Sequence, residues 1–115
     1  MEKSSYNYLL IRGEMKIVIT SAPPAESEKL VQNLLEERLI GCGNIWGNVQ
    51  SMYWWKGEIQ REPESLIIME TTDELVEEMI ARIVELHSYD VPKVLAVEPK
   101  NVNQAYRLWL EEETK

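Results

Sequence analysis

The sequence is poor in the residues that most often build covalent frameworks or metal sites. Its 115 residues include one cysteine, Cys42, and one histidine, His87. A single cysteine excludes an internal disulfide framework. Because neither residue type occurs as a closely spaced pair, the patterns typical of zinc sites are absent. A metal site would need carboxylates or residues of other subunits to complete it.

Long apolar runs and clusters of basic residues are also missing. No apolar stretch approaches the ~20 residues of a membrane-spanning helix, and residues 1–14 lack the features of a secretion signal. The 20 acidic residues outnumber the 12 lysines and arginines, which gives a formal net charge of −8. This excess argues against nucleic-acid or anionic-membrane partners. We expect a cytoplasmic protein.

The composition is that of an ordinary globular domain, with 44% hydrophobic and 28% charged residues. We expect residues 15–115 to form a single domain. Residues 1–14 would be an N-terminal extension. It is either the result of an upstream start or a genuine extra strand, since Tyr6, Tyr8 and Leu10 recur at every second position.

Strand and helix signals alternate along the chain. The expected strands lie near 16–20, 42–54, 58–69 and 91–98, and the expected helices near 30–39, 75–84 and 102–110. Gly41 is placed to end the first helix, and Thr71 with Glu74 has the spacing of a capping box for the second. Asn101 or Asn103 can cap the last helix. Pro63 indicates a bend or an edge within its strand.

The order βαββαβ followed by a helix predicts an α+β, ferredoxin-like fold, in which helices cover one face of an antiparallel sheet. The open face then needs another cover, and self-association is the simplest. Trp54 and Trp55 are adjacent and should point to opposite faces. One indole would enter the core, and the other would meet a subunit interface or a ligand cleft. Alternatively, both rings fold back into one core.

Four segments, in order and spacing, resemble motifs of the CutA family of divalent-cation tolerance proteins, and the likeness covers about Met15 to Glu111. The segments are Arg38–Ile45, Tyr53–Ile59, His87–Pro92 and Asn103–Leu110. The resemblance implies a homotrimer in which the long second and third strands pair across subunits. It also implies a role in the response to divalent metals, without enzymatic activity and with no required cofactor.

At several positions the sequence differs from the family pattern, and these differences bear on metal binding. Copper-binding family members have a cysteine at the position of Thr20 and a histidine pair at Leu86 and His87, of which only His87 is present. We therefore expect weak copper or zinc binding, with His87 as the one candidate ligand. His87 can instead stabilise the C-terminal end of a helix. Glu70 stands where the family usually has lysine, which disfavours an anionic ligand there.

The remaining matched positions with polar tips or broad rings are candidates for a cleft or a subunit interface. They are Tyr53, Trp54, Trp55, Lys56, Tyr89 and Trp109.

Two other classes compete with a CutA-like protein. A PII-like trimeric signalling module shares the fold plan, but the sequence lacks a basic, glycine-rich phosphate-binding loop. A hydrolase would pair Cys42 with His87, although a lone cysteine is most often a small buried hydrophobe.

Overall fold

The computed structural model describes residues 10–11 and 14–115. The strands are β1 (Leu10–Ile11), β2 (Met15–Ala22), β3 (Cys42–Trp55), β4 (Glu58–Thr72), β5 (Val94–Val97) and β6 (Val102–Asn103), and the helices are α1 (Pro24–Glu36), α2 (Val76–Leu86) and α3 (Gln104–Glu113). None of these helices is long and apolar enough to span a membrane.

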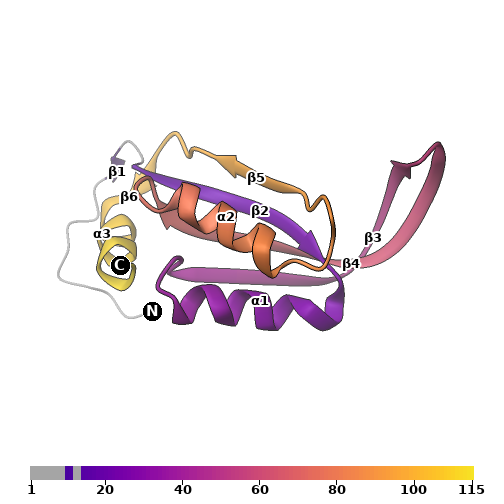
Figure 1. Ribbon diagram of the computed structural model, residues 1–115. Coiled ribbons are helices and arrows are strands. Elements are labelled where there is room, and N and C mark those ends of the chain that lie inside the picture. The colour runs from indigo at the N-terminus through magenta and orange to yellow at the C-terminus, as the bar shows by residue number, and fades with distance from the viewer. Residues whose placement is uncertain (1–9, 12–13) are drawn as a thin grey trace.

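The main sheet has the strand order β3-β4-β2-β5, and every neighbouring pair is antiparallel. Helices α1 and α2 lie together against one face, while α3 lies at one end of the sheet (Figure 1). The ferredoxin-like α+β prediction is therefore confirmed, including the extra C-terminal helix. The fourth expected strand is shorter than predicted, because pairing with β2 covers only Val94–Val97.

The core fills the space between this face and the two helices. Alternate residues of β2 and β4, such as Val18, Ile67 and Met69, are fully buried there against Leu34 of α1 and Met79 of α2. The period of two in the strands and the helical spacing of the apolar residues bring these side chains to one layer. Both amphipathic helices were predicted from that spacing.

Two predicted helix boundaries are wrong. Helix α1 ends at Glu36, and the left-handed residue after it is Arg38 (φ 59°) rather than Gly41. Thr71 does not cap α2, because β4 continues through it and pairs it with Lys16. Its hydroxyl instead donates a 2.7 Å hydrogen bond to the buried carbonyl of Leu39. The strand ladder and this buried bond outcompete the local capping pattern.

The cap of α3 is as predicted: the Asn103 side chain accepts a hydrogen bond from the backbone N–H of Ala105. Just before α3, strand β6 pairs with β1, with Ile11 opposite Val102. Tyr6 and Tyr8, on which the extra strand was argued, lie outside the described residues. The division of the chain at residue 14 stays a prediction.

Strands β3 and β4 are much longer than the strands beside them and project from the domain as a hairpin arm (Figure 1). Among the described strands, residues 58–64 of β4 pair with β3 alone. Pro63 lies in this part, so it occupies an edge, as predicted, without interrupting the strand. A bulge between Trp46 and Val49, with Asn48 at φ 59°, accompanies the change in direction of the arm. The arm makes the molecule elongated, 52 × 26 × 25 Å.

Candidate functional site

A groove of about 540 Å³ lies at the base of the hairpin arm. Side chains of the arm form one side, and the loop between α2 and β5 forms the other. Its lining includes Tyr53, Trp54, Trp55, Glu64, Tyr89 and Lys93. The volume falls within the range of small-molecule sites, and the mixture of broad rings with a few charged groups is typical of such sites.

Glu64 and Tyr89 join the two sides of the groove. The Tyr89 hydroxyl donates a 2.8 Å hydrogen bond to Glu64 Oε2, and Glu64 is only 5% exposed. Burial, and then the hydrogen bond and negative charge of Glu64, raise the pKa of Tyr89 well above its usual range. The phenol therefore stays protonated and donating at neutral pH. The pair holds the loop against the arm.

His87 fixes this loop to strand β2. Its Nε2 lies 2.7 Å from the carbonyl oxygen of Ser21, so this nitrogen carries the proton and donates. Its Nδ1 accepts a 3.1 Å hydrogen bond from the backbone N–H of Tyr89, and the two rings lie 4.6 Å apart between centroids. Both nitrogens are engaged, so a metal ion could bind His87 only if one of these hydrogen bonds broke.

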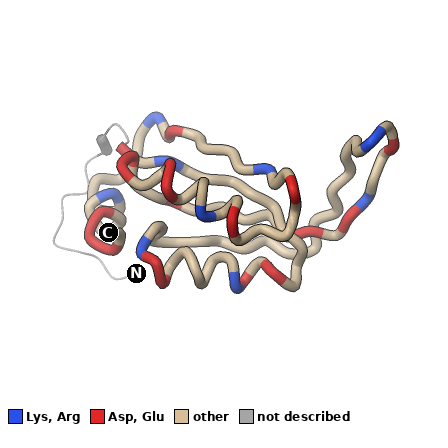
Figure 2. The backbone as a smooth tube through the Cα atoms, viewed as in Figure 1, with Lys and Arg blue, Asp and Glu red and all other residues tan. Residues whose placement is uncertain are grey.

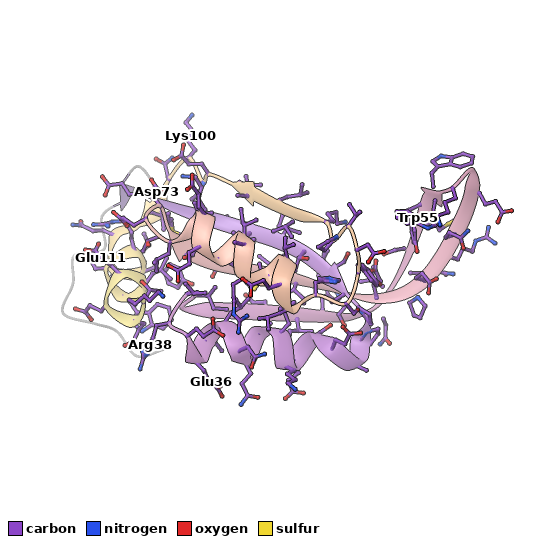
Figure 3. The ribbon with its side chains drawn as sticks, viewed as in Figure 1. Glu36, Arg38, Trp55, Asp73, Lys100 and Glu111 are labelled. Carbon is purple, nitrogen blue, oxygen red and sulfur yellow. The ribbon has the colours of Figure 1, made fainter. Side chains whose placement is uncertain are left out.

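The adjacent tryptophans do not behave as the alternation argument predicted. Neither indole enters the core: Trp54 is 71% exposed and Trp55 is 45% exposed. The reason is that the arm projects beyond the domain, so both faces of its ribbon lie outside the core. Trp55 is visible on the arm, far from Glu111 of α3 (Figure 3). Both residues line the groove.

A second polar cluster lies at the opposite end of the sheet. The Tyr106 hydroxyl of α3 donates a 2.6 Å hydrogen bond to Glu70 Oε1, and Glu70 pairs across the ladder with Cys42. Burial, and then the charge of Glu70, raise the pKa of the Cys42 thiol. The thiol is therefore a poor nucleophile. Trp109 packs here beside Tyr106, 5.5 Å between ring centroids.

The register separates Cys42 from His87. Cys42 lies level with Ile17 of β2, through Glu70, whereas His87 contacts Ser21 at the other end of the same strand. Four residues of strand span about 13 Å. The structure therefore does not assemble the pair that a hydrolase would need. In addition, among the residues that the structure describes, no group of three or more histidine, cysteine or acidic side chains is placed to hold a metal ion.

The predicted site residues thus divide between two ends of the molecule. Four of them line the groove, namely Tyr53, Trp54, Trp55 and Tyr89, and His87 contacts Tyr89. Lys56 is exposed at the turn of the arm, and Trp109 belongs to α3 at the other end. Sequence reasoning missed Glu64 and Lys93. Glu64 is one of 20 acidic residues, and only the contact with Tyr89 across the groove distinguishes it.

The ferredoxin-like sheet with a long β3–β4 hairpin defines the class of protein, and comparison with known proteins defines the family. The family profile described as CutA1 divalent ion tolerance protein matches residues 15–113. This chain is 46% identical over 102 residues to the divalent-cation tolerance protein CutA of Pyrococcus horikoshii, covering 88% of this chain and 99% of that protein. It is 38% identical to the CutA protein of Thermotoga maritima, covering 84% and 96%.

Solved structures agree with the sequence comparison. The crystal structure of CutA1 from Pyrococcus horikoshii superimposes with a TM-score of 0.83 at 42% identity, covering 87% of this chain and 98% of that one. CutA1 from Oryza sativa gives a TM-score of 0.85 at 30% identity, covering 90% and 96%. The chain belongs to the CutA1 family of divalent ion tolerance proteins, and the resemblance seen in its sequence motifs is confirmed.

Proposed function

We propose that this protein is a homotrimer that contributes to tolerance of divalent metal ions and binds a small ligand at clefts between its subunits. It requires no cofactor and is not an enzyme. The observation that carries the proposal is the apolar surface that one subunit leaves uncovered on the open face of its sheet and along its arm. The names of its relatives support the link to divalent ions.

The open face is apolar where α3 does not reach. The strand register places Ile19 of β2, Ile68 of β4 and Leu95 of β5 side by side on this face, level with Asn44 of β3. Leu95 is 50% exposed, and Trp46, two residues along β3 from Asn44, is 68% exposed. Monomeric proteins rarely leave so much contiguous apolar surface in water. Copies of the same chain, with arms pairing across subunits, would cover it.

The assembly is tested by the mass in solution. Light scattering of the purified chain should give about 40 kDa, which is three times the 13.4 kDa of one chain. A stable particle of 13 kDa would contradict the proposal. A dimer would contradict the threefold arrangement while leaving the apolar face covered.

The metal link is tested by titration of the trimer with copper and with zinc. Because both nitrogens of His87 are hydrogen-bonded and Thr20 replaces a soft ligand, we expect weak binding with little preference. The substitution His87→Ala should change it little. Tight copper binding that this substitution abolishes would mean that the trimer assembles a true copper site around His87. Adenosine triphosphate serves as the comparison ligand, because tight binding would favour a PII-like module.

A further inference from the structure

We propose that the groove at the base of the arm binds a small organic ligand that carries a positively charged amine, with Glu64 as the residue that recognises the charge. This inference rests on the proposed cleft ligand and names its chemical class. The structure supplies three independent arguments: an incompletely paired buried carboxylate, aromatic walls, and the charge balance of the lining.

The first argument concerns Glu64. A carboxylate offers about four acceptor positions, but Glu64 accepts one hydrogen bond, from Tyr89 to Oε2. Among the described residues, no donor reaches its other oxygen, Oε1. Only 5% of the residue is exposed, so the carboxylate is poorly hydrated, and a poorly hydrated carboxylate is costly unless it is paired. An ammonium group in the groove would supply the missing donor through a charge-assisted hydrogen bond.

The second argument concerns the walls. Tyr53, Trp54, Trp55 and Tyr89 all line the groove. The faces of such rings attract cations, and several rings around one cavity are a recurrent means of recognising ammonium groups. The rings also provide apolar area for the body of an organic ligand. A bare metal ion has no apolar part that could pack against these rings.

The third argument is the local charge. Glu64 and Asp90 line the groove against the single cation Lys93, and the whole chain carries −8. An anionic ligand would therefore meet repulsion from two carboxylates, whereas an amine is attracted. A divalent metal ion is disfavoured because three ligating side chains do not converge on the groove in the described part of the chain.

The test uses the whole 115-residue chain and compares two ligands that differ by one ammonium group. Tyramine carries an ammonium group on an ethylphenol frame, and 4-ethylphenol has the same frame without charge. Calorimetry and tryptophan fluorescence, to which Trp54 and Trp55 should respond, report binding. We expect tyramine to bind about tenfold or more tightly than 4-ethylphenol, as a charge-assisted hydrogen bond to Glu64 requires.

The substitution Glu64→Gln tests whether the negative charge of Glu64 causes the preference for tyramine. Glutamine keeps the shape and can still accept the hydrogen bond from Tyr89, so the groove should persist while the preference for tyramine is lost. The control is Glu62→Gln, an exposed residue on the same strand, which should keep the preference. Equal binding of the two ligands by the unaltered protein, an undiminished preference in Glu64→Gln, or no binding at all would overturn the proposal.

The outcome is separable from that of the proposed function. If the trimer forms but tyramine does not bind, the amine inference fails and the assembly stands. Tyramine would fail to bind, for example, if a lysine or arginine of a neighbouring subunit were already paired with Glu64. In that case Glu64→Gln would weaken the trimer in light scattering without any ligand present.

Discussion

At the residue scale, two tyrosines perform the same physical task at opposite ends of the sheet. Tyr89 donates to Glu64 and Tyr106 donates to Glu70, at 2.8 and 2.6 Å. In both cases a phenol from outside the sheet is fixed to a carboxylate on β4. Burial first, and then the carboxylate partner, raise the pKa of each phenol above its ordinary value of 10.0.

This linkage predicts a loss of stability in alkali. The unfolded chain ionises its tyrosines near pH 10, whereas the folded chain keeps Tyr89 and Tyr106 neutral. Stability linked to these phenols is full below pH 10 and falls as the pH rises above it. Urea unfolding of Tyr106→Phe at pH 8 and pH 11 should show a smaller loss than the unaltered protein. Tyr53→Phe is the control, and identical losses in all three proteins would contradict the role of Tyr106.

At the element scale, close packing decides where glycine is needed. A Cβ atom on Gly43 of β3 would lie 2.6 Å from Val31 Cγ1 of α1, whereas one on Gly47, in the bulge of the same strand, would meet nothing within 4 Å. Val31 is β-branched and cannot easily turn away. Helix α1 therefore lies against β3 at Gly43 more closely than any other residue would allow.

The two glycines form a matched pair for mutation. Gly43→Ala should lower the free energy of unfolding by about 1–3 kcal/mol, because the added methyl group overpacks the contact between helix and sheet. Gly47→Ala should change it by no more than about 0.5 kcal/mol. Denaturant midpoints at one fixed protein concentration measure both. A Gly43 variant as stable as the Gly47 variant would show that α1 shifts without cost.

At the scale of the whole molecule, the chain has a well-buried core but leaves many large apolar side chains exposed. Acidic residues occur on all three long helices and on the arm rather than in one patch (Figure 2). The apolar surface is concentrated instead on the open face and the arm, where Trp46, Met52, Trp54 and Ile59 are each more than half exposed. This exposed apolar surface favours assembly through the sheet and the arm.

The proposed assembly would link folding to concentration. The midpoint of thermal unfolding should rise with protein concentration, and Trp54→Ala should weaken the trimer more than Trp55→Ala, since Trp54 is the less covered by its own chain. Burying a full indole at an interface is worth about 3–5 kcal/mol per site. Leu35→Ala, on the outer side of α1, is the control. A midpoint independent of concentration, or equal and negligible effects of both tryptophans, would contradict the arrangement.

The sequence by itself determined the order of the elements, the helix-covered face and the family. These follow from local quantities: β-branched runs, apolar residues at helical spacing such as Leu30 and Leu34, and motifs of fixed spacing. Where a local signal had a tertiary competitor, it failed. Thr71 has the spacing of a cap, but the ladder with β2 and the buried carbonyl of Leu39 claim it.

Only the tertiary structure decided the site. The sequence placed Trp54 and Trp55 side by side, but whether an indole enters the core depended on whether the hairpin lies over the domain or beyond it. That is set by the mismatch in length between β3–β4 and their neighbours. Glu64 and Tyr89 are 25 positions apart and meet only because the strand register and the loop after α2 bring them together. Contacts between residues far apart in the sequence leave no local periodic pattern. The aromatic residues of the groove could therefore be predicted from the sequence, whereas Glu64 could be identified only from the tertiary structure.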